Sequence, residues 1–304
     1  MARRLHTPAD FDKNVYERLQ RRRGKPNRQG TATIMALVPG SDHRKYVSRT
    51  SPAHPNVAAN RRFYDALWSA SELVAPQRFN TWPLLSKLGM EAPTRLEIGP
   101  GLRPRLSLAG TYFIDLSEPA LSALRRRGGL AAFGEINALP FPDSTFDVVC
   151  AFDIVEHVDD DQGVFRELAR VAKDEAPVVF SVPLHPTRWS AFDDLVGHVR
   201  RYDPERLLAT LGEHSFVLEQ SARFGMQPRN RWLLDFAVWG LTQRPQQAAR
   251  WYNKLFLPLG LLLQRRLAWA SGLIDVSNVD ELLLVCRRRA RVGAEPPLPT
   301  GSAP

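Results

Sequence analysis

The chain has 304 residues, of which 44% are hydrophobic and 24% are charged, proportions that are typical of soluble globular proteins. Its net charge is +9, but the first 50 residues hold 12 of the 41 basic and 4 of the 32 acidic side chains, so the rest carries only +1. A nearly neutral remainder argues against a fold that binds nucleic acid through a basic groove. The longest apolar run, "LFLPLGLLL" at 255–263, is far shorter than the roughly 20 residues that span a bilayer.

The chain contains two cysteines, and no apolar segment follows the charged residues of the first stretch, "MARRLHTPADFDKN". Cys150 and Cys286 lie inside "FDVVCAF" and "LLLVCRR", apolar runs of strand length. We expect two buried reduced thiols rather than a disulfide, and we predict no metal site. These features favour a cytoplasmic protein without a secretory signal.

The first part of the chain differs in pattern from the rest. Residues 1–50 include "RRRGKPNRQG" and show no sustained apolar period, which predicts a basic, disordered arm. In residues 51–93 apolar and small residues recur at helical spacing between prolines, which predicts an N-terminal cap of two or three short helices. Residues 291–304 are predicted as a disordered tail.

From residue 94 to residue 290 strand-like runs alternate with helical patterns. The expected strands are "TRLEI", "TYFID", Leu130–Phe133, "FDVVCAF", "APVVFSV", Phe216–Ala222 and Glu281–Cys286. Asp203 and the proline after it are typical of a helix start. The alternation predicts an α/β domain with a doubly wound, mostly parallel sheet covered by helices on both faces.

A leucine- and tryptophan-rich segment, residues 226–275, separates the last two predicted strands. It carries basic residues beside its aromatic ones, including Arg250, Lys254, Arg265 and Arg266. We predict a helical insertion that packs on the sheet as a lid, or a lid that also rests on a membrane or binds a lipid-like molecule, since Leu, Trp and Arg together suit an interface.

Polar groups and glycines follow the first three predicted strands. Gly99 and Gly101 come after the first, Asp115 ends the second, and Glu135 follows the third. In a parallel sheet ligands bind beyond the carboxyl ends of the strands, and a carboxylate there can accept both hydroxyls of a ribose. Taken singly, each feature also fits a tight structural turn or a solvated carboxylate.

Taken together, "LEIGPG", "FIDLS" and "GEINALPFPDSTFDVVCAFDIVEHV" occur in the order of the class I methyltransferases that use S-adenosylmethionine. The resemblance runs from about Thr94 to Arg287. It implies a Rossmann-like, seven-stranded sheet with the last strand inserted antiparallel, and S-adenosylmethionine as the cofactor. Gly99 and Gly101 match the family's turn over the methionine part of the cofactor, and Glu97 matches the acidic residue just before it. Asp115 matches the ribose carboxylate, Glu135 and Ile136 match the residues at the adenine, and Leu116, after Asp115, is a further predicted cofactor-binding residue.

The glycine turn departs from a dinucleotide-binding pattern. Pro104 stands where the third glycine of G-x-G-x-x-G belongs, which counts against NAD. Because 14 positions separate Gly101 from Asp115, and because proline fits badly inside a helix, we expect a shortened helix after the turn. Arg103 or Arg105 then either reaches toward the cofactor carboxylate or lies on the surface.

Histidines follow the fourth and fifth predicted strands. His198 and His185 lie in "VPLHPTRWSAFDDLVGHVRRYDPERL", where the resemblance places substrate-facing loops, and His157 lies in "EHV". A histidine near neutral pKa can take the proton of an acceptor hydroxyl. His198 is the first candidate base, followed by His185 and His157, although a single histidine in such a position is more often a structural hydrogen-bonding residue.

The pattern as a whole favours methyl transfer to a small or amphipathic, lipid-like acceptor, with peripheral membrane contact and no stable nucleic-acid binding. The alternatives are an RNA-binding methyltransferase or partner protein that uses the basic arm, and a non-catalytic cofactor-binding fold. Against the RNA alternative, "AFDI" follows the fourth strand in place of an N-P-P-Y-like tetrapeptide. An NAD oxidoreductase is the weakest alternative. The sequence does not indicate an oligomeric state.

Overall fold

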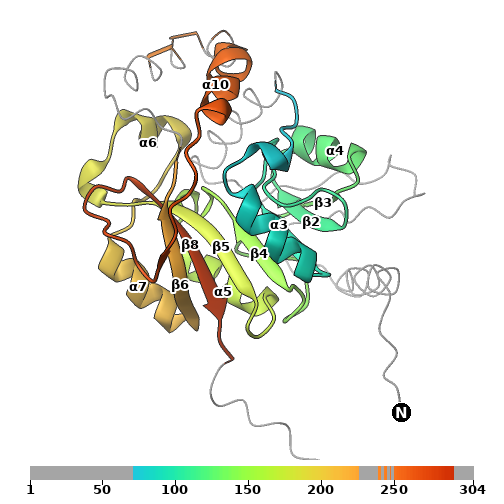
Figure 1. Ribbon diagram of the computed structural model, residues 1–304, viewed down its shortest axis with the longest axis vertical. Coiled ribbons are helices and arrows are strands. Elements are labelled where there is room, and N and C mark those ends of the chain that lie inside the picture. The colour runs from blue at the N-terminus through green and yellow to red at the C-terminus, as the bar shows by residue number, and fades with distance from the viewer. Residues whose placement is uncertain (1–70, 226–238, 241–242, 245–246, 248–249, 291–304) are drawn as a thin grey trace, which may run out of the picture.

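The computed structural model describes residues 71–225, 239–240, 243–244, 247 and 250–290. A mixed eight-stranded sheet lies at its centre, in the order β3-β2-β1-β4-β5-β8-β6-β7 (Figure 1). The strands are β1 (Arg95–Ile98), β2 (Thr111–Asp115), β3 (Leu130–Phe133), β4 (Val148–Ala151), β5 (Pro177–Pro183), β6 (Phe216–Arg223), β7 (Ala270–Ser271) and β8 (Glu281–Arg288). Neighbouring strands from β3 to β5 are parallel, whereas β8 runs antiparallel to both β5 and β6.

The predicted α/β class and the antiparallel insertion of the last strand are confirmed. The predicted number of seven strands is wrong by one, because β7 adds a two-residue edge strand that pairs with Gln220 and Ser221 of β6. This strand lies inside the segment 226–275, for which the sequence predicts helices. Both residues of β7 are exposed and too few to show an alternating apolar pattern, so only their backbone pairing with β6 makes them a strand.

Helices cover both faces of the sheet. The helical elements are η1 (Pro76–Arg78), α3 (Trp82–Glu91), α4 (Glu118–Arg126), η2 (Val155–His157), α5 (Asp161–Val171), η3 (Pro186–Arg188), α6 (Ala191–Val196), α7 (Pro204–Glu213), η4 (Tyr252–Phe256) and α10 (Leu257–Leu262). α5 and α7 pack in one core cluster with Val149 of β4, whereas α3 packs in another with Val148. Successive β4 side chains thus enter opposite layers, as strand geometry requires.

The two cysteines are buried and free in the structure, as expected from their apolar surroundings. Cys150 belongs to the layer that contacts α3, and Cys286 to the layer that contacts α5 and α7. Burial raises the pKa of both thiols, so both are held in the unreactive protonated form.

No helix connects β1 to β2, which corrects the expectation of a shortened one. Residues 99–110 form turns and irregular chain. Pro104 would interrupt a helix by removing a donor and by clashing with the preceding turn. The loop instead buries Leu102 and Leu106, and it places its backbone against the buried carboxylate of Glu97.

The arm at 1–50 and the tail at 291–304 lie outside the described residues, as do the cap up to residue 70 and most of 226–249. Within the described cap, η1 and α3 are the helical elements. Among the described helices, none is long and apolar enough to cross a membrane.

Candidate functional site

The glycine turn, residues 99–101, leaves β1 in a conformation that favours glycine. Gly99 has φ of 64° and Gly101 has φ of 53°, a left-handed region that costs little without a Cβ atom. A Cβ on Gly99 would lie 2.2 Å from Cδ1 of Ile154 in the loop after β4. The turn is therefore packed directly against the segment that leads from β4 into η2.

Asp115 at the end of β2 is joined to the glycine turn. Its Oδ2 accepts a hydrogen bond from the backbone N–H of Gly101 at 2.8 Å, and its Oδ1 accepts one from Ser117 at 2.8 Å. A carboxylate has about four acceptor positions, so a side chain of this type can bind hydroxyl groups as well as backbone N–H groups. Leu116, half-buried, follows it.

Glu97 is buried and accepts hydrogen bonds from the backbone N–H groups of Arg105 and Leu106 at 2.8 to 3.0 Å. Burial raises the pKa of this carboxyl to about 7, although the backbone donors and Arg105 oppose the shift. Glu97 thereby holds the irregular β1–β2 loop in place of helical hydrogen bonds.

Arg105 is buried, so the sequence-based alternative that it lies on the surface is wrong. Its guanidinium lies 3.8 Å from the ring centroid of Phe79 and 5.6 Å from those of Phe152 and Phe224. Burial lowers its pKa, while the nearby carboxylate of Asp153 opposes that effect. Arg103 lies over the ring of Tyr252, 5.0 Å from its centroid.

The two residues predicted at the adenine follow β3 and differ in exposure. Ile136 is buried in the core cluster that contains Ile114, whereas Glu135 is exposed. Both residues follow the carboxyl end of β3, and an adenine contact of either stays a prediction.

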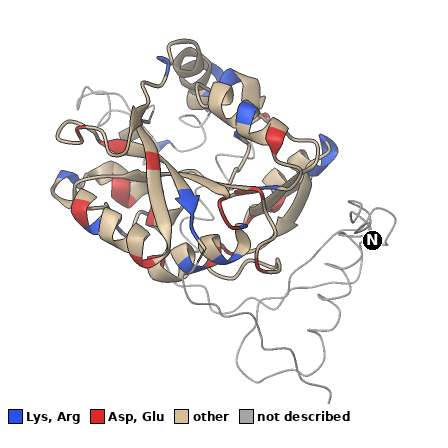
Figure 2. Ribbon diagram, turned by 60° about the horizontal axis from the view of Figure 1, so that its bottom comes forward, with Lys and Arg blue, Asp and Glu red and all other residues tan. Residues whose placement is uncertain are grey.

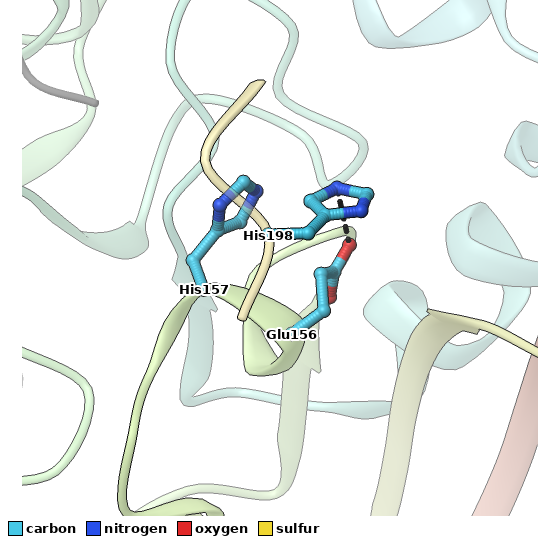
Figure 3. A group of neighbouring side chains, drawn as sticks. All are labelled: Glu156, His157 and His198. Atoms are coloured by element: carbon cyan, nitrogen blue, oxygen red, sulfur yellow. Dashed lines mark ion pairs between the residues drawn. The ribbon is translucent and has the colours of Figure 1, made fainter. Parts of the chain in front are cut away.

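Glu156, His157 and His198 form a second group at this edge, named here the histidine cluster. Glu156 and His157 belong to η2, and His198 comes from the loop between α6 and α7; Figure 3 shows the three side chains turned toward one another. One ligand atom from each lies within 4.8 Å of the others, and the two imidazole rings are 4.8 Å apart, edge to face. The tertiary structure thus joins two of the three predicted histidines.

Hydrogen bonds orient both rings of the histidine cluster. Nδ1 of His198 lies 2.8 Å from Oδ1 of Asp193, and Nδ1 of His157 lies 3.1 Å from the carbonyl oxygen of Gly197. Because the carbonyl oxygen can only accept, and because the Asp193 carboxylate is ionised, both Nδ1 atoms carry the proton. A ring in this tautomer that carries no second proton has its lone pair on Nε2.

Asp193 is itself buried and held by three side chains. Arg201 donates to its Oδ1 at 2.8 Å and Ser190 to its Oδ2 at 2.8 Å. Although burial by itself would raise it, the hydrogen bonds from His198, Arg201 and Ser190 hold the pKa of Asp193 well below its usual range. A permanent carboxylate therefore supports the His198 ring.

Glu156 is buried at 1% exposure, with Oε1 3.8 Å from Nε2 of His198. Its Oε2 has no hydrogen-bond partner among the described residues. Burial, followed by the neighbouring Asp153, raises the pKa of Glu156 well above its usual value. Burial and the adjacent His198 lower the pKa of His157 to about 4, which keeps that imidazole neutral.

His185 lies apart from the histidine cluster in its contacts. Its Nε2 is 2.8 Å from the carbonyl oxygen of Val276, and its backbone N–H donates to Tyr202. This arrangement ties the loop after β5 to the approach of β8, as a structural residue would.

The site also contains residues that the sequence did not single out. Glu156 stands in the "EHV" motif beside His157, so that motif was its available signal. Asp193 had no such signal, because an acidic residue near a helix start is most often a cap, and Asp193 does complete a capping box with Ser190. Its second contact, with His198, exists only in the folded chain.

The strand order, the glycine turn and the Asp115 carboxylate match the arrangement of a class I methyltransferase domain, a class that uses S-adenosylmethionine. In agreement, residues 96–180 match the family model described as a methyltransferase domain.

The chain is also similar to individual proteins. It is 30% identical over 108 residues to the probable S-adenosylmethionine-dependent methyltransferase Rv3030 of Mycobacterium tuberculosis, covering 34% of this chain and 39% of that protein. It is 30% identical over 182 residues to Rv2003c of the same organism, covering 59% of this chain and 61% of that protein. A solved S-adenosylmethionine-dependent methyltransferase from Thermotoga maritima superimposes with a TM-score of 0.46 at 14% identity, covering 76% of this chain and 92% of that one.

Proposed function

We propose that the protein transfers a methyl group from S-adenosylmethionine to a small or lipid-like acceptor. The observation that carries the proposal is the continuity of the site: Asp115 is hydrogen-bonded to the glycine turn, and the turn is packed against Ile154, two residues before the histidine cluster. Cofactor-binding and acceptor-facing groups therefore adjoin at one edge of the sheet.

The residues present fit S-adenosylmethionine. Asp115 has acceptor capacity for the ribose hydroxyls, Ile136 offers an apolar contact for the adenine, and Gly99 and Gly101 bring the backbone close without side chains. When bound, this cofactor supplies an activated methyl group on a sulfonium. None of these residues forms the extended phosphate cradle that a dinucleotide needs.

Catalysis in this proposal depends mostly on alignment. The acceptor atom attacks the methyl carbon as the carbon–sulfur bond breaks, the sulfur keeps the electron pair, and S-adenosylhomocysteine is left. Holding the acceptor, carbon and sulfur in line removes much of the entropic barrier. If the acceptor is a hydroxyl, its proton must leave, and in this proposal an imidazole of the histidine cluster, His198 before His157, takes it.

The segment 251–264 supports a lipid-like acceptor. It packs on the N-terminal cap through Leu257 and Leu261, and Tyr252 contacts the cluster of Leu102, the residue after the glycine turn. Large apolar side chains on it remain exposed: Trp251, Leu255, Phe256, Leu259, Leu262 and Leu263. In Figure 1, α10 lies beyond the sheet on the side of α6.

Peripheral membrane contact through this segment, a cytoplasmic location and the absence of stable nucleic-acid binding belong to the same proposal. The free, buried cysteines support a reducing compartment. Acidic and basic residues are interspersed over the described ribbon in Figure 2, without a stripe of one sign that would favour a nucleic-acid partner.

The test has two stages. Calorimetry should first detect binding of S-adenosylmethionine and S-adenosylhomocysteine, and no binding at millimolar ligand would overturn the proposal. The protein is then incubated with labelled S-adenosylmethionine and, separately, a polar-metabolite extract and a lipid extract of cells that lack it. Label transferred to lipid supports the lipid-like acceptor, label in the polar extract supports a small one, and label in neither contradicts methyl transfer to these classes.

A variant distinguishes the role of the exposed apolar segment. Replacing Leu262 and Leu263 by Ser should reduce transfer to the lipid extract while preserving cofactor affinity. Val217→Ser, at an exposed apolar residue of β6, is the matched control and should leave transfer unchanged. Equal transfer by all three proteins would show that the segment does not contact the acceptor.

A further inference from the structure

The histidine cluster brings one imidazole nitrogen of each histidine and one oxygen of Glu156 within 4.8 Å of one another. Nε2 of His198 and Oε1 of Glu156 are 3.8 Å apart, which is beyond hydrogen-bond distance. Both side chains are nearly inaccessible, at 7% and 2% exposure. Buried polar atoms need a partner, and these two do not supply one to each other.

The second carboxyl oxygen of Glu156 also lacks a partner. Oε2 is buried and has no hydrogen-bond partner in the part of the chain that the structure describes. Buried polar atoms are satisfied in the great majority of proteins, and an exception calls for an explanation such as an ion. The carboxylate is thus anchored by its position on η2 and still requires a partner.

The supporting shell is of the kind that surrounds metal-binding histidines. Such ligands commonly donate their second ring nitrogen to a carboxylate or a backbone carbonyl, which sets the tautomer. His198 donates to the Asp193 carboxylate and His157 to the Gly197 carbonyl. Asp193 lies in the first turn of α6 and Gly197 caps its C-terminal end, so one short helix orients both rings.

We propose that Glu156, His157 and His198 bind one divalent cation. Two imidazole nitrogens and one carboxylate oxygen suit an ion that accepts mixed ligands, such as Zn²⁺ or Mn²⁺. Ligand atoms at about 2.0 to 2.2 Å from one ion are at most about 4.4 Å apart. The three donors already lie within 4.8 Å of one another, so movements of less than about 1 Å bring them onto one ion.

The location gives the ion a use, which rests on the proposed methyl transfer. Ile154 contacts the glycine turn two residues before Glu156, so the cation lies beside the cofactor-binding edge. Three protein ligands leave coordination positions for an acceptor oxygen, and a bound cation lowers the pKa of a hydroxyl that ligates it. The acceptor class is therefore an alcohol, a phenol or a hydroxy acid, and His198 is an ion ligand instead of a free base.

The first experiment measures the ion directly. The full-length protein is freed of metal with a chelator, dialysed and titrated with Mn²⁺ under electron paramagnetic resonance and with Zn²⁺ by calorimetry. The expected result is one ion per chain, with nitrogen hyperfine coupling from two imidazoles in the Mn²⁺ spectrum. Absence of stoichiometric binding of both ions at millimolar concentration would overturn the proposal.

Variants then assign the ligands. Glu156→Gln, His157→Gln and His198→Gln should each weaken ion binding at least 10-fold, whereas His214→Gln should leave it unchanged. His214 is a suitable control because it caps the C-terminal end of α7 and its ring contacts Gln162, outside the histidine cluster. Circular dichroism identifies any variant that fails to fold. If a variant does not fold, the nitrogen hyperfine coupling of the unaltered protein decides whether two imidazoles bind the ion. Full affinity in folded ligand variants would place the ion elsewhere and overturn the assignment.

The outcome for the ion is separate from that for the methyl donor. Cofactor binding is measured without added metal and metal binding without cofactor. If the protein binds the ion but not S-adenosylmethionine, the metal site stands and the methyl-transfer proposal is overturned. If it binds S-adenosylmethionine but no ion, the methyl-transfer proposal stands and the metal site is overturned.

Discussion

Ile154 occupies the space that a side chain on residue 99 would need: a Cβ on Gly99 would lie 2.2 Å from its Cδ1 atom. This contact couples the turn after β1 to the loop after β4, since the two can approach only if residue 99 is glycine. The glycine turn and the loop that leads into the histidine cluster are therefore parts of one packed unit.

Gly99→Ala should lower both stability and cofactor affinity. The φ of 64° costs an alanine about 1 to 2 kcal/mol, and the clash with Ile154 adds to this. We expect a lower melting temperature and an affinity for S-adenosylhomocysteine reduced at least 10-fold, measured by calorimetry. Gly128→Ala is the control, because Gly128 has φ of 87° with nothing within 4 Å of the added atom. Equal cofactor affinities for the two variants would contradict the coupling.

Asp115→Ala should weaken cofactor binding by about 1.5 to 3 kcal/mol, the range for hydrogen bonds to a charged group. Some stability is also lost, because the side chain holds Gly101 and Ser117. Asp115→Asn keeps one acceptor oxygen, so its cofactor affinity, measured by calorimetric titration, should lie between those of the unaltered protein and Asp115→Ala. An unchanged affinity in both variants would mean that the ribose lies elsewhere.

His198→Ala should lower turnover about 10²-fold or more, the usual contribution of a group that assists proton removal, while cofactor affinity stays nearly unchanged. His185→Ala should leave turnover nearly intact, because its ring is held by the Val276 carbonyl outside the histidine cluster. Rates are measured on the acceptor fraction identified with labelled cofactor. A larger loss of turnover for the folded His185 variant would reverse these assignments.

Asp147 should make stability depend on acid pH. Although burial by itself raises it, hydrogen bonds from Lys173 and Thr94 lower the pKa of this carboxyl in the folded state. A lowered folded pKa gives stability that is present above the unfolded value of about 3.9 and is lost as pH falls through the folded value.

Asp147→Asn should therefore reduce the free energy of unfolding by about 1 to 2 kcal/mol at pH 7, with the difference shrinking below about pH 4. Denaturant unfolding across this range measures it. Asp143→Asn, at an exposed partner of Arg170, is the control and should cost no more than about 1 kcal/mol. A pH-independent difference for Asp147→Asn would show that the charge is not what stabilises the fold.

Residues 1–34 are predicted to be dispensable for cofactor binding, because the apolar pattern begins later and the basic charge is concentrated there. A chain that begins at Met35 should keep its melting temperature and its affinity for S-adenosylmethionine. Loss of folding would contradict the prediction of a disordered arm. If the full chain binds RNA in a salt-dependent manner and the shortened chain does not, the alternative of an RNA-binding protein is favoured.

The sequence by itself determined the order and type of most described elements, because their signals are local. The apolar runs of β4, β5 and β8 required strands buried on both faces, and Asp203 with its following proline required a helix start, which α7 has. The positions of Gly99, Gly101 and Asp115 at strand ends were likewise readable, since parallel strands end at one edge of a sheet.

Tertiary structure decided which of those groups act together. His198 and His157 are 41 positions apart, and only the packing of the α6–α7 loop on η2 brings their rings within 4.8 Å, leaving His185 outside. Tertiary structure also settled the edge strand β7 through its pairing with β6, and it settled the helix-free β1–β2 loop through buried hydrogen bonds to the Glu97 carboxylate. Such contacts carry no local period, because backbone pairing and buried hydrogen bonds depend on what the folded chain places opposite them.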